Sequence, residues 1–145
     1  MGNLKLTSSA FSDGGEIPRE CGYKHGNEEP PLSSSGIPEG TKSLSLIMDD
    51  PDAMEPAGKV WVHWVAWNID PTKTELAKST EGMTDFGEVG YGGPAPPDKR
   101  HTYVFKLYAL DSELDLPDKS TKADVEKAME GHIIEQTQLT GTYAP

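Results

Sequence analysis

The sequence predicts a mainly β protein, an antiparallel β-sandwich with one or two peripheral helices. Two long apolar segments, Val60–Ile69 and Thr102–Leu110, are rich in β-branched and aromatic residues, which favour strands. Only one stretch, Thr121–Gln136, has the amphipathic periodicity of a convincing helix. Clusters of Gly, Pro, Ser and Asp divide the rest of the chain into short pieces, as turns do in β domains.

Five strands are expected in chain order. The strongest, Val60–Ile69, is almost wholly apolar, so we expect it to be covered on both faces. In Ser43–Met48, leucine and methionine alternate with the other residues at the spacing of a strand. The full set is Leu4–Leu6, Ser43–Met48, Val60–Ile69, Thr102–Leu110 and Gln138–Tyr143.

The expected helix begins at a capping box. Thr121 is followed three residues later by Asp124, which stands where Glu or Gln is usual. One helical face then carries apolar residues at Val125, Met129 and Ile133, although Gly131 interrupts the stretch. A second, short helical turn is expected over Glu75–Ser79.

Length and charge limit the classes of function. The chain has 145 residues, so we expect one domain over residues 1–145. No apolar run is long enough to cross a membrane and no signal segment follows Met1, which predicts a cytoplasmic protein. A formal net charge of -11 argues against nucleic acid and anionic membrane surfaces as partners. The single cysteine, Cys21, cannot form an internal disulfide.

Two segments each place a constrained loop beside a strong strand that carries a histidine. Asp49–Ala53 precedes the strand of His63, and Gly90–Pro97 precedes the strand of His101. Alternation along a strand predicts which residues share a face with each histidine. For His63 these are Trp61 and Val65, and for His101 they are Tyr103, Phe105 and Leu107. Two histidines beside loops of this kind favour a binding site.

The motifs in these segments are DPDA followed by VWVHW, and GGPAPP followed by HTYVFKLYALD. This pair resembles the two signature blocks of the phosphatidylethanolamine-binding protein family, and most closely its short prokaryotic branch of Raf-kinase-inhibitor-like proteins. The likeness covers nearly the whole chain, including Leu6–Phe11, Pro30–Ser33, Glu130–His132 and Gly141–Tyr143. The paired blocks are highly specific, whereas a lone DPD would not be.

The resemblance implies a β-sandwich with a small pocket at one end that binds anions such as phosphate, acetate or a phosphoethanolamine head group. The chain departs from the family's pattern at Met54, Ser34 and Thr102, where proline, tryptophan and arginine are usual. These departures bear on the rim of the pocket and on ligand preference. By motif position, the ligand-binding residues would be Asp50, Asp52, His63, Gly93, Pro94, His101 and Tyr103.

The residue types in the two segments also suit an oxyanion on chemical grounds. Glycines at positions 92 and 93 allow a ligand to approach the backbone, where amide N–H groups donate. The side chains of His63, His101 and Tyr103 are further hydrogen-bond donors. The prolines of Pro94–Pro97 stiffen the rim and reduce the entropy lost on binding.

The two aspartates allow two interpretations. Asp50 beside an anion makes sense where it accepts a hydrogen bond from a histidine, which fixes the tautomer and favours the imidazolium form. Alternatively, Asp50 and Asp52 only stabilise the turn around Pro51. The sequence leaves both interpretations open.

We therefore expect a ligand-binding protein and not an enzyme, with no cofactor, no metal and no catalytic residue. The chain lacks the G-x-S-x-G motif, and its His and Asp spacing matches no compact metal motif. Two alternatives stay open: an interaction protein that regulates kinases or proteases, as some family members do, and an unrecognised hydrolase or lyase. The resemblance also implies a homodimer.

Overall fold

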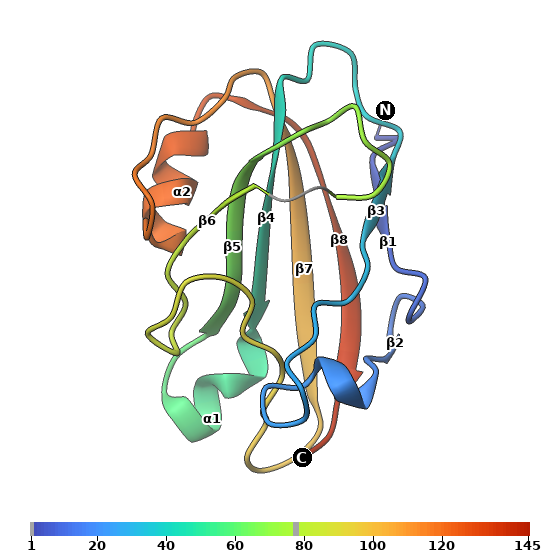
Figure 1. Cartoon of the computed structure of the whole chain (residues 1–145), viewed down its shortest axis with the longest axis vertical. Helices are drawn as coiled ribbons and strands as arrows, with labels where there is room; N and C mark the ends of the chain where they lie inside the picture. The colour runs from blue at the N-terminus through green and yellow to red at the C-terminus, as the bar shows by residue number, and fades with distance from the viewer. Residues whose placement is uncertain (1, 77–78) are drawn as a thin grey trace.

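The structure is a computed structural model that describes residues 2–76 and 79–145. Within these residues the strands form two sheets, which confirms the predicted mainly β fold (Figure 1). The smaller sheet pairs β1 (Lys5–Thr7) with β3 (Ser33–Ser35) in antiparallel fashion. The larger sheet has the spatial order β2 (Gly15–Glu16), β8 (Ile133–Tyr143), β7 (His101–Leu110), β4 (Ser43–Asp50), β5 (Trp61–Ile69) and β6 (Thr80–Glu81).

Neighbouring strands of the larger sheet are antiparallel, except that β2 runs parallel to β8.

Short helices lie outside the sheets. None of the helices described in residues 2–76 and 79–145 has the length and apolar character that crossing a bilayer requires. They are the 3-10 helices η1 (Arg19–Cys21) and η2 (Pro51–Ala53) and the α-helices α1 (Met54–Ala57) and α2 (Lys122–Met129).

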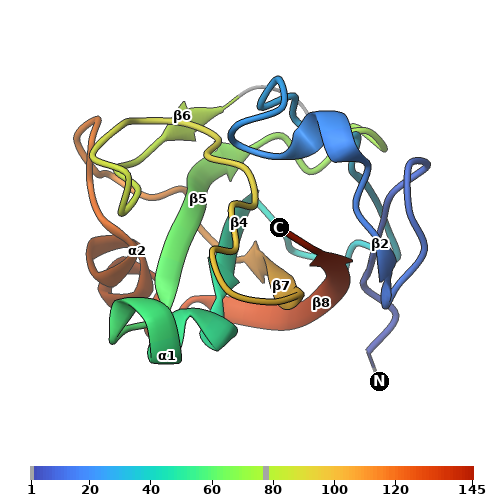
Figure 2. The same cartoon turned by 90° about the horizontal axis from the view of Figure 1, so that it is seen from below.

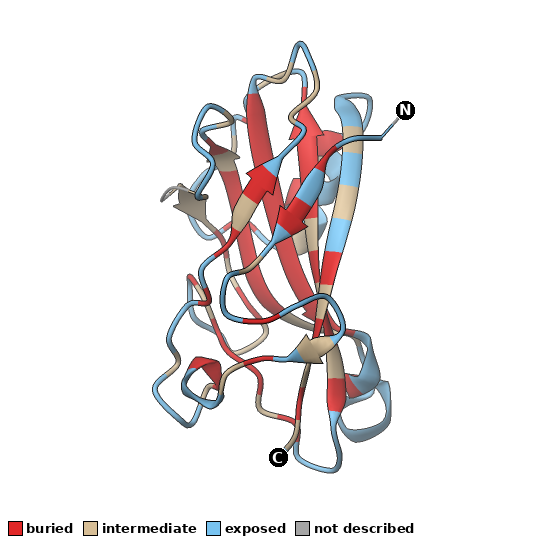
Figure 3. Ribbon diagram, turned by 90° about the vertical axis from the view of Figure 1, so that its right-hand side faces the viewer, coloured by how far each residue is buried: buried red, intermediate tan, exposed pale blue. Residues whose placement is uncertain are grey.

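The central strands of the larger sheet are covered on both faces. Every residue of β4 is buried, and most of the middle of the sheet is buried (Figure 3). One face forms a core with the smaller sheet, which contributes Leu6, while β4 contributes Leu46. The other face packs Ile47 against Val125 of α2. Because side chains alternate along a strand, one strand supplies both cores.

Helix α2 starts as predicted but ends early. The capping box is present: the Thr121 hydroxyl accepts from the Asp124 amide, and the Asp124 carboxylate accepts from the Thr121 amide. The helix ends at Met129, so the predicted end at Gln136 is wrong. Gly131 has a φ of 80°, which turns the chain out of the helix, and Ile133 then pairs with Leu110 in the larger sheet.

Other boundaries also differ from the sequence prediction. The last strand begins at Ile133 instead of Gln138, because pairing along β7 fixes its register. Of the helical turn predicted over Glu75–Ser79, residues 77 and 78 lie outside the described residues, and Glu75 forms a β-bridge with Ser33. The short strands β2, β3 and β6 lack an apolar pattern, and the sequence did not predict them.

A bulge in β5 sets the direction of His63. Met48 pairs with Trp64, but the next residue of β4 pairs with Val62, so His63 is an extra residue on its strand. Its side chain therefore lies on the same face as both Trp61 and Trp64, while Val65 packs on the opposite face beside α2. The prediction that His63 shares a face with Val65 is wrong, because alternation fails at a bulge.

The two segments with the family motifs meet at one end of the larger sheet. Helices η2 and α1 follow β4 there, and the loop 92–100 leads into β7 beside them (Figure 2). The Asp52 side chain fixes this meeting, because its carboxylate accepts a hydrogen bond of 2.8 Å from the Thr102 amide. The start of β7 is thus tied to the turn that follows the end of β4.

Asp49 and Asp50 are adjacent in sequence but serve opposite faces of the sheet. Asp49 is buried on the outer face, where its Oδ2 lies 3.2 Å from Nζ of Lys106 and 2.9 Å from Nζ of Lys122. These ion pairs join β4 to β7 and to the first turn of α2. Asp50 instead faces the end of the sheet where the two motif segments meet.

We expect Asp49→Asn to lower the free energy of unfolding by about 1–3 kcal/mol, because both lysines lose a charged partner. Urea denaturation measures the change. Asp118→Asn is the matched control, since it removes the same charge from an exposed residue. Equal stability of the two variants would contradict a role for Asp49 in holding α2.

Candidate functional site

A cavity of about 200 Å³ lies where the motif segments meet. Its residues come from β4, the η2–α1 turn, β5, the loop before β7, and β7 itself. Most of its lining is apolar, with a few polar groups, as in small-molecule sites generally. The lining residues are Asp50, Ala53, Pro56, Ala57, Trp61, His63, Phe86, Ala95, Pro97, His101 and Tyr103.

His101 lies between two carboxylates. Its Nδ1 is 2.6 Å from Oδ2 of Asp50, and its Nε2 is 2.7 Å from Oδ1 of Asp98. Ionised carboxylates only accept hydrogen bonds, so the two contacts require a proton on both ring nitrogens. The side chains of His101 and Asp50 are 1% and 4% exposed, whereas that of Asp98 is 37% exposed. The site therefore holds a buried imidazolium with one buried and one partly exposed counter-ion.

The pKa values of these groups follow from burial and from each other. Burial acts against a charged His101, but its hydrogen bonds to both carboxylates outweigh this and raise its pKa above the ordinary value of 6.5. Burial raises the pKa of Asp50, and the hydrogen bond from His101 opposes that rise. Desolvation acts to raise the pKa of Asp98, but the hydrogen bond and charge of His101, together with nearby backbone amides, outweigh it and lower the pKa.

His63 is in the opposite state. Its Nδ1 lies 2.7 Å from the carbonyl oxygen of Gly92, which can only accept, so Nδ1 carries the proton. Burial lowers the pKa of His63 to about 4, so the ring is neutral near pH 7. In that tautomer Nε2 carries a lone pair. One histidine of the cavity is thus a cation and the other a neutral hydrogen-bond acceptor.

Two buried donors at the cavity have no hydrogen-bond partner within the described protein. They are the indole Nε1 of Trp61 and the hydroxyl of Tyr103. The Tyr103 hydroxyl lies near the Asp50 carboxylate and the Ala95 amide, but it makes a well-formed hydrogen bond with neither. Burial and then the charge of Asp50 raise the pKa of Tyr103, so its hydroxyl stays protonated. An unpaired buried donor costs about 1–3 kcal/mol. The side chains of both residues line the cavity.

Aromatic rings form the side walls. Phe86 comes from the loop after β6 and stacks on Tyr23, with ring centroids 4.2 Å apart and planes 5° apart. It also meets Trp61 and His63 edge-on, at centroid distances of 5.7 and 5.2 Å. Tyr103 also lies edge-on to His63, with ring centroids 5.1 Å apart. These contacts hold the rings that carry the polar groups in fixed positions.

The structure brings four of the seven predicted site residues to the cavity. Asp50, His63, His101 and Tyr103 line it, whereas Asp52, Gly93 and Pro94 do not. Asp52 accepts from the Thr102 amide, as described above, which is a structural role. The Asp50 carboxylate accepts from the Asp52 amide, at 2.9 Å, and also binds His101. Asp50 therefore both stabilises the turn around Pro51 and pairs with a histidine.

The glycine amides expected to donate to a ligand are already occupied. The Gly92 amide donates to the carbonyl of His63 at 2.8 Å, and the Gly93 amide donates to Oδ1 of Asn27 at 2.7 Å. A Cβ at Gly93 would lie only 2.0 Å from the carbonyl oxygen of Cys21. The Pro94 carbonyl accepts from the Tyr23 amide. This turn therefore packs the rim together instead of presenting donors to the cavity.

Sequence reasoning missed three residues of the site. Trp61 was expected on the face of His63 but was not assigned a role, because its free indole N–H is visible only in the structure. Phe86 lies in a loop without periodicity, and the rings that it contacts are distant in sequence. Asp98 lies three residues before His101, but nothing in the sequence shows that it turns back onto the ring.

Comparison with known sequences identifies one family. The family model described as "Phosphatidylethanolamine-binding protein" matches residues 7–144. The chain is 44% identical to the UPF0098 protein of Methanothermobacter thermautotrophicus over 151 aligned positions, covering 97% of this chain and 98% of that protein. It is 41% identical to the UPF0098 protein of Chlamydia muridarum, again covering 97% and 98% of the two chains.

Comparison with solved structures agrees. A homologue of phosphatidylethanolamine-binding protein from Chlamydia trachomatis, CT736, superposes with a TM-score of 0.91 at 40% identity, covering 97% of this chain and 96% of that one. YbcL of E. coli, described as a new member of the mammalian PEBP family, superposes with a TM-score of 0.88 at 31% identity, covering 98% of both chains. The fold and the motifs thus point to the same family.

We expect the pKa values of the two cavity histidines to be shifted in opposite directions from the ordinary value. In an NMR titration of the imidazole signals, His63 should stay neutral until about pH 4, and His101 should stay charged above its ordinary value of 6.5. The folded His63 takes up its proton later than the unfolded chain does, so its effect lowers stability as pH falls from 6.5 towards 4. The contribution of His101 is complete below 6.5 and is lost as pH rises through its raised pKa. Titration of both rings near 6.5 would contradict these assignments.

Proposed function

Because the chain belongs to the phosphatidylethanolamine-binding protein family, we propose that its cavity binds a small anion without converting it. The ligand class comprises phosphate, acetate and the phosphoester of a phospholipid head group, which share an anionic oxygen. The observation that carries the proposal is the pair of buried, unpaired donors, Trp61 Nε1 and the Tyr103 hydroxyl, at one cavity.

An anion accounts for these donors better than a neutral ligand or water does. Hydrogen bonds from buried donors to a charged acceptor contribute about 1.5–3 kcal/mol each, more than those to a neutral one. The imidazolium of His101 also lines the cavity, and its Nε2–H becomes a further charged donor when Asp98 moves away from it. Tyr103 lies two residues further along β7 and on the same face, so its side chain and that of His101 border the same cavity.

His63 adds a preference among anions. As a neutral ring with Nδ1 bound to Gly92, it has only an acceptor left, at Nε2. It therefore favours a ligand that carries a proton beside its anionic oxygen, such as a phosphate monoanion or the ammonium group of phosphoethanolamine. This modifies the expectation that both histidines donate to the anion.

Binding without turnover fits the chemistry of the lining. Among the described residues that line the cavity there is no Ser, Thr, Cys or Lys to act as a nucleophile. Asp50 is held by hydrogen bonds from the Asp52 amide and His101, so neither of its oxygens is free to attack. A hydrolase would have to use the His63 lone pair to activate water, and turnover of a phosphoester would reveal it.

We expect Trp61→Phe and Tyr103→Phe each to weaken phosphate binding by about tenfold or more, because each removes one donor to the anion. Neither change removes a well-formed hydrogen bond from the free protein, so the free energy of unfolding should stay equal or rise. Calorimetric titration of phosphate and phosphoethanolamine measures the affinity.

Trp67→Phe is the matched control. The indole Nε1 of Trp67 is also buried and unpaired, but Trp67 packs in the core beside α2 and does not line the cavity. It should therefore leave the affinity unchanged. An effect of Trp67→Phe as large as that of Trp61→Phe, or no effect of either cavity variant, would contradict the proposed site.

Three finer expectations from the sequence stay predictions. We propose that the protein acts in the cytoplasm and forms a homodimer, and that a kinase or protease partner is the alternative to a ligand-only role. Light scattering at physiological salt would decide the oligomeric state. Loss of a partner in a pull-down with Trp61→Phe would connect partner binding to the cavity.

A further inference from the structure

The contact between Asp98 and His101 raises a problem for the proposed ligand. Both ring N–H groups of His101 are already bound to protein carboxylates. The cation therefore has no donor left for an anion. With Asp50, His101 and Asp98 all ionised, this group of side chains carries a net negative charge, which repels a second anion.

The two carboxylates differ in how easily they can leave the ring. Asp50 is 4% exposed, and its other oxygen caps the turn of η2 through the Asp52 amide. Asp98 is 37% exposed and lies on the loop before β7, so rotation of its side chain would carry its charge into solvent. Its departure would leave a neutral Asp50–His101 pair with Nε2–H free to donate.

The loop that carries Asp98 is also part of the cavity. Pro97 lines the cavity, and Lys99 makes an exposed ion pair of 3.0 Å with Glu55 of α1, on the opposite side. The residues on either side of Asp98 thus contact the cavity and α1, whereas the Asp98 side chain is partly exposed. A bound anion could replace its carboxylate on Nε2 without rearrangement of the rim.

We propose that Asp98 is a specificity-determining residue that competes with the ligand anion for Nε2 of His101. This rests on the proposed function, because it requires an anion in the cavity. The internal carboxylate weakens the binding of every simple anion, so only a ligand that gains enough from Trp61, Tyr103 and His63 displaces it. Asp98 thereby sets a threshold against abundant small anions.

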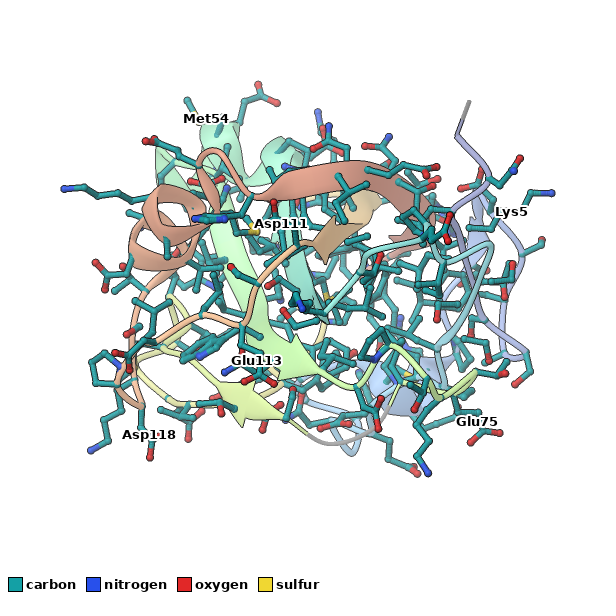
Figure 4. All side chains as sticks on the ribbon, turned by 90° about the horizontal axis from the view of Figure 1, so that it is seen from above. Lys5, Met54, Glu75, Asp111, Glu113 and Asp118 are labelled. Carbon is teal, nitrogen blue, oxygen red and sulfur yellow. The ribbon has the colours of Figure 1, made fainter. Side chains whose placement is uncertain are left out.

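The test is calorimetric titration of inorganic phosphate into the wild type, Asp98→Asn and Asp118→Asn. At a pH of about 5.5 a histidine with an ordinary pKa is charged, so His101 is a cation even if it loses Asp98. Phosphate is then a monoanion that carries protons, and it can donate to Nε2 of His63. We expect Asp98→Asn to bind about tenfold more tightly than the wild type, because one charge-assisted hydrogen bond no longer competes. Asp118→Asn, which removes the same charge far from Met54 of α1 (Figure 4), should bind like the wild type.

The outcomes separate the two proposals. Phosphate binding by Asp98→Asn but not by the wild type would also support competition. Equal affinity of the wild type and Asp98→Asn, with weaker binding by Trp61→Phe, would overturn the role of Asp98 and leave the proposed function standing. Absence of binding in all variants would overturn both.

A second measurement guards against a different role for Asp98. NMR of the His101 ring in Asp98→Asn should show that it is still charged at about pH 5.5, because Asp50 remains bound to Nδ1. A neutral ring would overturn the proposal, since Asp98 would then be needed to charge His101. Unchanged thermal unfolding would show that the variant is folded.

Discussion

The hydrogen bond between Asp50 and His101 is the interaction on which the site depends. It joins the last residue of β4 to the first residue of β7, two paired strands at the centre of the larger sheet. A buried carboxylate or imidazolium alone would be strongly destabilising, whereas the pair is tolerated when each charge has further partners. Asp50 finds one in the Asp52 amide, and His101 finds one in Asp98. The turns that carry these partners are therefore held at the end of the sheet, and they form the walls of the cavity.

The cavity concentrates features that a protein core otherwise avoids. It has two buried donors without partners, a buried cation, and a bulge that turns His63 onto the same face as Trp64. The unpaired donors lower the stability of the free protein, and a bound anion would compensate for them. Burial in the rest of the sheet offsets this loss of stability, because β4 is buried along its whole length and packs into a core on each face.

The sequence was sufficient for the long strands, the family and the faces of β7, but not for every feature of the site. Alternation placed His101, Tyr103, Phe105 and Leu107 correctly, because β7 keeps an unbroken register with β8 through these residues. It failed for His63, since a bulge leaves no mark on local composition. The predicted C-terminal end of α2 was wrong for a related reason. After Met129 the pairing of β8 with β7 overrides the helical pattern, and this pairing is a long-range effect. Contacts such as Asp98 with His101 and Phe86 with Tyr23 depend on loop paths that no periodicity encodes.

The most direct measurement of the central claim is a phosphate titration followed through the indole N–H signals of the three tryptophans. Trp64 Nε1 already donates to Glu81, and Trp67 lies in the other core. Of the three indoles, therefore, Trp61 is the one with a free donor at the cavity. An anion bound there should move the Trp61 N–H signal strongly, in the direction of a stronger hydrogen bond, and leave the signals of Trp64 and Trp67 nearly unchanged. A saturable shift of the other two with a static Trp61 signal, or no shift at all, would contradict anion binding in this cavity.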